Sequence, residues 1–231
     1  MLENELQFEK TLFFQLNGSE SAFLDNFFYL YSYKWTWFLF YLCFLFIFCY
    51  KKKLREIICI LLAIGLIVLL CDQIASGFFK PFFHRFRPTH HPDFEAQVKT
   101  VMGYKGGLYG FISSHASNVS GFAVFTSLVF RNGLYMSMMF LFALLTVYSR
   151  VYLGVHFISD IVAGALVGSL VGYSVYRLYQ FVRYKWLKVA KNNTKPGFSQ
   201  WESNFLCGVF GVYLTFLLLF SNQLVKILFQ E

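Results

Sequence analysis

Residues 157–181 read FISDIVAGALVGSLVGYSVYRLYQF and form the stretch that decides the fold. Apart from one charged residue near each end the run is uncharged, and it is long enough to cross a bilayer as a helix, which takes ~20 residues. Gly164, Gly168 and Gly172 recur every four residues, so they share one face of that helix. Small residues at this spacing let two helix backbones approach closely within a membrane. The stretch therefore predicts a transmembrane helix packed inside a bundle.

Apolar runs of similar length lie on both sides of this stretch. With it, they give six expected spans: about Phe28–Tyr50, Ile57–Phe79, Ser114–Phe130, Leu134–Tyr152, Phe157–Phe181 and Phe205–Leu224. Because the runs are long and continuous rather than short and alternating, they predict helices and not the strands of a membrane barrel. We expect an all-α, polytopic membrane helical bundle with six transmembrane helices.

The N-terminal segment, residues 1–27, has a different character. Its apolar residues alternate with polar neighbours: Leu12, Phe13, Phe14 and Leu16. This pattern predicts an interfacial amphipathic helix that lies on the membrane, rather than a seventh span. A role as a lateral gate for a lipid is the alternative. We divide the chain into this segment and one six-span domain, residues 28–231.

The composition agrees with a membrane protein. Of 231 residues, 57% are hydrophobic and 14% are charged, whereas soluble domains carry about a quarter charged residues. The cysteines all fall in apolar stretches and form no CxxC pair, so neither a disulfide framework nor a zinc site is predicted. They are Cys43, Cys49, Cys59, Cys71 and Cys207.

The net charge of +8 is not a sign of nucleic-acid binding, because the basic residues cluster between apolar runs. The clusters are Lys51, Lys52, Lys53 and Arg55, and Arg183, Lys185, Lys188, Lys191 and Lys195. Such loops face the cytoplasm by the positive-inside rule. We therefore expect loops 51–56, 131–133 and 182–203 inside, and both termini with loops 80–113 and 153–156 outside. The acidic N-terminus lacks the basic region of a cleavable signal peptide.

The outer loop 80–113 is nevertheless basic, against that rule, and anion binding is a sufficient reason. Lys80 and Arg87 lie in it, and Arg150 ends the fourth span. Three cations at one site repel one another without an anion, and Arg is suited to bidentate contacts with phosphate. We interpret Arg85 as a snorkelling interfacial residue, and intramembrane Asp72 as structural support for Lys80.

Two groups of residues can supply the chemistry. His156 and Asp160 are neighbours if they lie on a helix, and a carboxylate on one ring nitrogen leaves the other free to act as nucleophile or base. Ser113, Ser114 and His115 directly precede or open the third span. A serine there caps the helix, its free N–H groups bind anions, and the histidine can act as a general acid. The loop histidines His84, His90 and His91 are read as surface residues rather than metal ligands.

The three blocks together resemble the signature of the type 2 phosphatidic acid phosphatase (PAP2) family. That signature is K-x6-RP, then P-S-G-H, then S-R-x5-H-x3-D, and the first and third blocks match at every defined position: Lys80, Arg87, Pro88, Ser149, Arg150, His156 and Asp160. The second block keeps Ser113 and His115 but has Ile112 for proline and Ser114 for glycine. Serine has less backbone freedom than glycine, so the change at Ser114 affects the backbone geometry of the N–H group that donates to the anion there.

The resemblance implies a role for each residue. His156 attacks phosphorus and becomes phospho-histidine, and Asp160 orients it. His115 protonates the leaving oxygen and then activates water. The phosphoryl oxygens are held without a metal or another cofactor by Lys80, Arg87, Ser113, Ser114 and Arg150.

We therefore expect an integral membrane phosphatase whose partner is a lipid phosphate and not a nucleic acid. Undecaprenyl diphosphate is the expected substrate; lipid A phosphate at the 1 or 4′ position and phosphatidylglycerophosphate or phosphatidate are the alternatives. The expected location is a bacterial inner membrane, with the site facing the periplasm or exterior. An anion or lipid transporter is the alternative of another class, but no internal repeat of the kind typical of transporters is evident.

Overall fold

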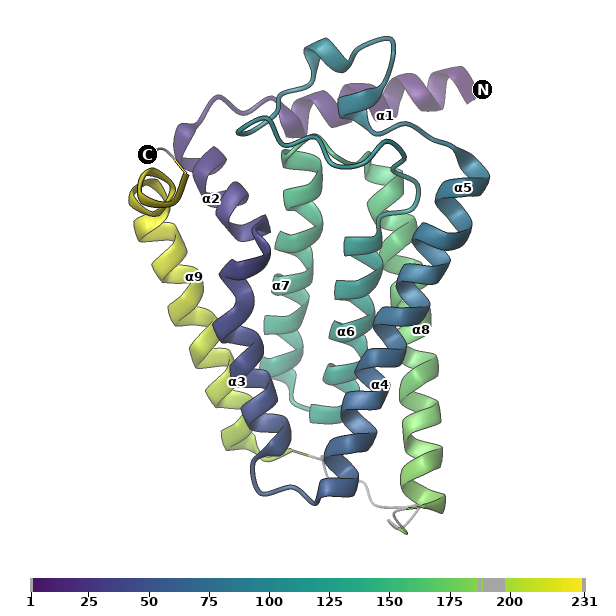
Figure 1. Ribbon diagram of the computed structural model, residues 1–231, viewed down its shortest axis with the longest axis vertical. Coiled ribbons are helices and arrows are strands. Elements are labelled where there is room, and N and C mark those ends of the chain that lie inside the picture. Colours follow the sequence, from purple (N-terminus) through teal and green to yellow (C-terminus); the bar gives the residue numbers. More distant parts are fainter. Residues whose placement is uncertain (1, 187, 189–197, 230–231) are drawn as a thin grey trace.

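The computed structural model describes residues 2–186, 188 and 198–229, and Figure 1 shows a bundle of upright helices with one helix across its end. Within these residues no strand is present beyond a single bridge between Phe86 and Tyr109. The α-helices are α1 (Leu2–Asn17), α2 (Ala22–Ser32), α3 (Phe38–Cys49), α4 (Leu54–Asp72), α5 (Lys80–Phe83), α6 (Ser114–Phe130), α7 (Gly133–Tyr152), α8 (Ile158–Lys185) and α9 (Gln200–Phe229). The all-helical class is confirmed.

Four helical segments are long and apolar enough to cross a membrane: Leu54–Phe83, Gly133–Tyr152, Ile158–Lys185 and Gln200–Phe229. A fifth is added if α2 and the segment Lys34–Cys49, which meet at 65°, count as one broken span. The prediction of six spans is therefore not confirmed. The remaining candidate, α6, has the predicted bounds but only 17 residues, which is at the lower limit for crossing the hydrocarbon core.

The first predicted span is broken rather than continuous. Tyr33 has an extended backbone, and a 3₁₀ turn, Lys34–Trp37, separates α2 from α3. The indole N–H of Trp37 donates to the carbonyl of Tyr31 at 2.6 Å, so the turn's own side chain satisfies a carbonyl near the end of α2. The second predicted span has another irregularity, a π-helical turn at Gln73–Phe79 that joins α4 to α5.

The glycine face predicted in the fifth span is the contact between α8 and α6. A Cβ atom added at Gly164 would lie 2.6 Å from the carbonyl oxygen of Ser113, and one added at Gly168 would lie 2.7 Å from the carbonyl carbon of Ser117. Both neighbours are backbone atoms, which cannot move aside as a flexible side chain can. The glycines therefore set the close approach of the two helices.

The N-terminal helix α1 lies across the end of the bundle (Figure 1). Phe13 is fully buried and its ring makes an edge contact with Phe157 at 5.5 Å. The side-chain amide of Asn17, 1% exposed, donates to the carbonyl of Tyr152 at 2.8 Å. The expected helix is thus present and docks on protein through Phe13 and Asn17, whereas Phe8 stays 70% exposed, so its place at the membrane interface stays a prediction. The chain division at residue 28 stays a prediction, and α2 begins before it.

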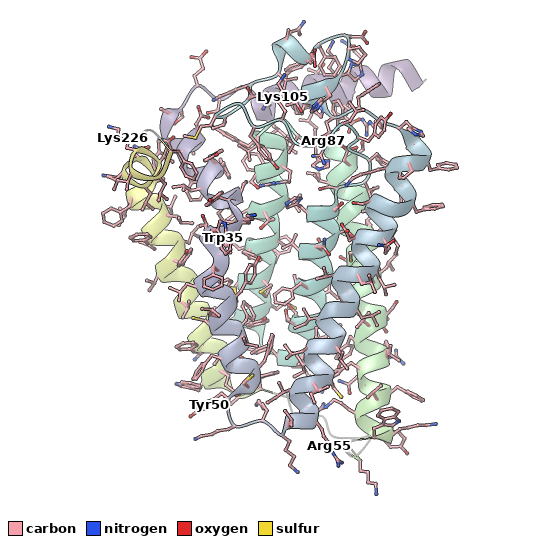
Figure 2. The ribbon with its side chains drawn as sticks, viewed as in Figure 1. Trp35, Tyr50, Arg55, Arg87, Lys105 and Lys226 are labelled. Carbon is pink, nitrogen blue, oxygen red and sulfur yellow. The ribbon has the colours of Figure 1, made fainter. Side chains whose placement is uncertain are left out.

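Basic residues lie at both ends of the bundle. In Figure 2 Arg55 lies at one end, whereas Arg87, Lys105 and Lys226 lie at the other. At the second end, Lys99 is paired with Asp25 of α2 at 2.6 Å, so this cation has a structural use. Of the residues assigned to the basic loops, Lys191 and Lys195 lie outside the described residues.

Candidate active site

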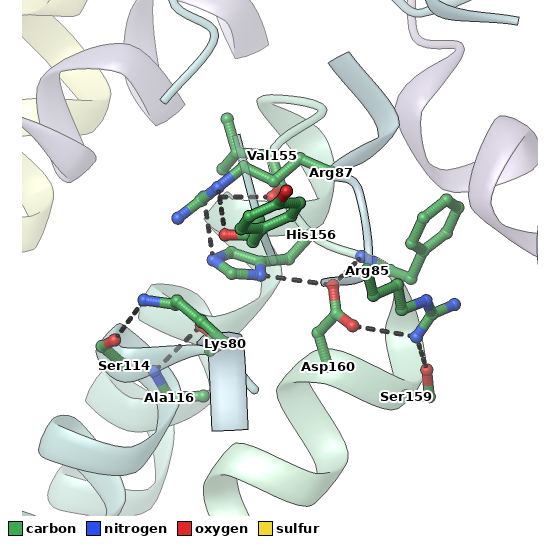
Figure 3. Close-up of polar contacts among 12 residues, drawn as sticks. Lys80, Arg85, Arg87, Ser114, Ala116, Val155, His156, Ser159 and Asp160 are labelled. Atoms are coloured by element: carbon green, nitrogen blue, oxygen red, sulfur yellow. Dashed lines mark hydrogen bonds and ion pairs between the residues drawn. The ribbon is translucent and has the colours of Figure 1, made fainter. Parts of the chain in front are cut away.

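All eight residues predicted to bind or act on phosphate lie at the end of the bundle that α1 covers. They come from α5 and the loop after it, the start of α6, the end of α7, the α7–α8 turn and the first turn of α8: Lys80, Arg87, Ser113, Ser114, His115, Arg150, His156 and Asp160. Figure 3 shows the contacts around Arg87, His156 and Asp160. The α6–α8 contact explains the arrangement, because it places the start of α6 against the start of α8.

His156 lies between a carboxylate and a guanidinium. Its Nδ1 is 3.3 Å from Oδ2 of Asp160, and its Nε2 is 3.0 Å from Nη1 of Arg87. Because a guanidinium only donates, Nε2 is the acceptor and the ring proton lies on Nδ1. The lone pair of Nε2 therefore points toward a cation that is suited to binding phosphate.

The expected pairing of His156 with Asp160 is present, but helical spacing is not its cause. The helix α8 begins at Ile158, so His156 precedes it. The carboxylate of Asp160 turns back and accepts the N–H of Phe157 at 2.9 Å. His156 and Asp160 are 1% and 0% exposed, so both groups are held out of water.

Burial lowers the pKa of the His156 imidazole from 6.5 to about 4, and Arg87 acts in the same direction, while the hydrogen bond with Asp160 opposes both. A histidine with a lowered pKa is neutral above that value, so His156 stays unprotonated at Nε2 well into the acidic range.

With ¹³C-labelled histidine rings, we expect the NMR signal that His156→Gln removes to titrate near pH 4. A midpoint near 6.5 for that signal would contradict this electrostatic account.

Lys80 is positioned by two hydroxyl groups. Its Nζ donates to Oγ of Ser114 at 2.7 Å and to Oγ of Ser76 at 3.0 Å. Ser76 lies in the π-helical turn and in turn donates to Oδ1 of Asp72 at 3.4 Å. The support of Lys80 by Asp72 is therefore indirect, through Ser76. Ser114 occupies the glycine position of the P-S-G-H signature, and its hydroxyl accepts a hydrogen bond from this lysine.

Ser113 connects α6 to α8. Its Oγ accepts the N–H of Ala116 at 3.3 Å, which confirms the predicted helix cap. Its own N–H donates to the carbonyl of Asp160 at 3.0 Å. The hydroxyl of Ser113 only accepts in this cap, so its O–H proton is left to donate to an anion, together with the N–H groups of Ser114 and His115 in the first turn of α6.

Arg150 and His115 line a cavity of about 310 Å³. Arg150 is 2% exposed, and its Nε donates to Oγ of Ser149 at 3.2 Å. The other described residues of the lining include three tyrosines and a lysine, and none of them is acidic: Tyr29, Ser32, Tyr33, Lys34, Tyr104 and Leu153. The cavity therefore suits a polar group with negative charge.

Arg85 belongs to the site, and its interpretation as a snorkelling residue is wrong. Its Nη1 lies 2.9 Å from Oδ1 of Asp160, and its Nη2 lies 2.6 Å from Oε2 of Glu9. The reason is electrostatic, because the buried Asp160 carboxylate has a second oxygen that His156 does not reach. Only the position of Arg85, two residues before Arg87, could have signalled this from sequence.

The loop histidines show no metal-binding arrangement. Among the described residues no three His, Cys, Asp or Glu side chains gather in a way that could hold a metal ion. His91 stacks on Phe94 with 4.1 Å between ring centroids, and its Nδ1 is 3.7 Å from Oδ2 of Asp93. The cysteines of the described residues are free thiols.

Comparison with known proteins gives a family match and two named relatives. The PAP2 superfamily model matches residues 56–184. The chain is 52% identical over 186 residues to a lipid A 4′-phosphatase of Porphyromonas gingivalis, covering 80% of this chain and 79% of that protein. It is 36% identical over 129 residues to a lipid A 4′-phosphatase of Bacteroides thetaiotaomicron, covering 55% of this chain and 56% of that protein.

Two solved structures have a similar fold. The crystal structure of LpxE from Aquifex aeolicus is 27% identical, with a TM-score of 0.53, and covers 72% of this chain and 93% of that one. The PAP2-type phosphatidylglycerolphosphate phosphatase of Bacillus subtilis is 19% identical, with a TM-score of 0.56, and covers 78% of this chain and 88% of that one. Because the Bacillus subtilis protein is only 19% identical, its similarity to this chain concerns the fold alone.

Proposed function

This chain belongs to the PAP2 superfamily and is a multi-pass membrane phosphatase, and on that premise we propose that it removes the 4′-phosphate of lipid A. The observation that carries the choice of substrate is the 52% identity to a lipid A 4′-phosphatase over most of both chains. Undecaprenyl diphosphate, the substrate expected from sequence, has no such support, and the lipid A alternative takes its place.

The proposed reaction proceeds in two steps through His156. Nε2 of His156 attacks phosphorus, so that an N–P bond forms while the P–O bond to the sugar breaks, and His115 gives its proton to the departing oxygen. Water then attacks phosphorus, its proton passes to His115, the N–P bond breaks and inorganic phosphate leaves. Asp160 keeps the Nδ1 proton in place through both steps, which is supported by its 3.3 Å contact.

Fixed cations stabilise the charge that spreads over the phosphoryl oxygens. In this proposal Arg87 turns from Nε2 of His156 to the phosphate once the substrate enters. Lys80, Arg150, Ser113 and the N–H of Ser114 complete the set. The proposal needs no metal, since protein cations carry out the neutralisation.

We place the site on the periplasmic side of a bacterial inner membrane. The basic residues around Arg55 (Figure 2) and in the last turn of α8 (Figure 1) lie at the opposite end of the bundle, which supports this orientation by the positive-inside rule. In this arrangement α6 and the broken α2–α3 pair both cross the bilayer, giving six spans, and α1 lies at the outer interface.

The cavity beside Arg150 is the proposed place for the sugar and its polar substituents. Tyr29, Tyr33 and Tyr104 offer ring faces and hydroxyls, which suit a hydroxylated ring, and Lys34 offers a charge. The volume of about 310 Å³ lies at the small end of the usual range for ligand sites, ~300–1,000 Å³. It therefore suits a headgroup, while the acyl chains lie in the bilayer.

The test is phosphate release by the purified protein from bisphosphorylated lipid A, undecaprenyl diphosphate and phosphatidylglycerol phosphate, each assayed with EDTA present. We expect the highest kcat/KM on lipid A, with mass spectrometry locating the loss at the 4′ position. A preference for undecaprenyl diphosphate would overturn the proposed lipid A substrate, and binding without phosphate release would favour a transporter.

We expect Lys34→Gln to raise KM for lipid A about tenfold, as the loss of one charged contact does.

A further inference from the structure

Glu9 of the N-terminal helix uses both carboxylate oxygens, one on the first turn of α8 and one on Arg85. Oε1 accepts the N–H of Ser159 at 2.7 Å, and Oε2 pairs with Nη2 of Arg85 at 2.6 Å. Arg85 continues the chain through Nη1, which is 2.9 Å from Oδ1 of Asp160 and 2.5 Å from Oγ of Ser159. A continuous set of charged contacts thus runs from α1 to the carboxylate behind His156.

We propose that Glu9 and Arg85 are positioning residues that hold the Asp160 carboxylate in its working orientation for His156. This inference rests on the proposed function, because it assigns a purpose to contacts of the same site. It gives the N-terminal helix a part in the reaction beyond membrane attachment.

The division of the Asp160 oxygens supports this inference. Oδ2 faces Nδ1 of His156 and the N–H of Phe157, whereas Oδ1 faces Arg85. With Oδ1 fixed, the carboxylate cannot rotate to offer a different oxygen to His156. The guanidinium is itself confined, because it lies 4.4 Å above the ring of Phe157.

Charge balance explains why Glu9 is needed as well as Arg85. Arg85 alone would cancel the negative charge of Asp160, which is the charge that stabilises a positive or phosphorylated His156. Glu9 adds one negative charge, so the group Glu9–Arg85–Asp160 has a net charge of −1. The arginine can then orient the carboxylate without removing its electrostatic effect on the histidine.

The burial of these groups distinguishes them from an ordinary surface ion pair. The side chains of Arg85 and Glu9 are 24% and 17% exposed, and that of Asp160 is 0% exposed. Charge pairs in such surroundings are screened far less than exposed ones. The docking of α1 through Phe13 and Asn17 keeps Glu9 at this position.

The experiment measures kcat and KM on lipid A for Glu9→Gln, with Glu20→Gln as the matched control. Glu20 is an exposed residue that follows the same helix. We expect Glu9→Gln to lower kcat about tenfold or more, as the loss of a supporting contact does in other sites, with KM changed less than about twofold. The control should match the wild type in both constants.

A double variant separates positioning from a merely structural role. If Glu9 acts through Arg85, then Glu9→Gln lowers kcat little further once Arg85→Gln is present. If Glu9 only fastens α1 to Ser159, its loss lowers activity by the same factor in both backgrounds, and the inference is wrong. Equal kcat for Glu9→Gln and wild type also overturns it. An inactive wild type would instead count against the proposed function, so the two failures are distinguishable.

Discussion

Replacing His156 with alanine is expected to lower kcat for phosphate release by about 10⁴-fold or more, the scale on which enzymes lose activity when a nucleophilic group is removed. Nε2 of His156 lies against Arg87, and Nδ1 lies against Asp160, so no other described imidazole has this combination of contacts. The measurement is a phosphate-release assay on lipid A. A ³²P-labelled protein, trapped by quenching in alkaline detergent because the N–P bond is unstable in acid, should form in the wild type and not in the variant.

Two further variants make this result interpretable. His156→Gln fills more of the buried site than alanine and should be equally inactive, which removes a folding defect as the explanation. His84→Asn is the control, because His84 is exposed and has a positive φ of 47° that asparagine tolerates. It should retain wild-type activity. Substantial turnover by well-folded His156→Gln would show that another group attacks phosphorus.

Gly168→Ala is expected to destabilise the protein by about 1–3 kcal/mol or more, the usual cost of overpacking a tight interior. The new methyl group would lie 2.7 Å from the carbonyl carbon of Ser117, so α6 and α8 must separate. Separation moves Ser113 and His115 away from His156 and Asp160, so activity should fall together with stability. Thermal unfolding in detergent, followed by circular dichroism, measures the first effect.

Gly65→Ala is the matched control for this prediction. A Cβ atom added at Gly65, in α4, would have no neighbour within 4 Å. The same substitution should therefore leave stability unchanged or raise it slightly, since alanine is the better helix former by about 1 kcal/mol. If both variants unfold at the same temperature as the wild type, the glycine face does not set the distance between α6 and α8.

Much of the site was predictable because its residues stand at the ends of apolar runs. A helix of known span places its end residues at a known depth, so Arg150 and His115 could be assigned to one membrane surface before any contact was known. The bounds of α6 and the packing role of Gly164 and Gly168 followed in the same way, from the length of the run and the size of the side chain.

The parts that sequence did not predict depend on contacts between distant segments. Arg85 pairs with Glu9, 76 residues earlier in the chain, and no periodic pattern signals such a pair. The break after Ser32 and the π-helical turn at Gln73–Phe79 are also absent from the hydropathy pattern, because each leaves its run apolar.

The contact between the glycine face of α8 and helix α6 also has a consequence for biogenesis. The two helices are separated in the chain by all of α7, and both His156 and Asp160 are synthesised after it. A nascent chain that ends before α8 therefore carries Lys80, Arg87 and Arg150, the proposed phosphate-binding cations, without the proposed His156–Asp160 pair. Under the proposed function, catalytic competence is therefore expected to arise late in synthesis, only once α8 has packed against α6.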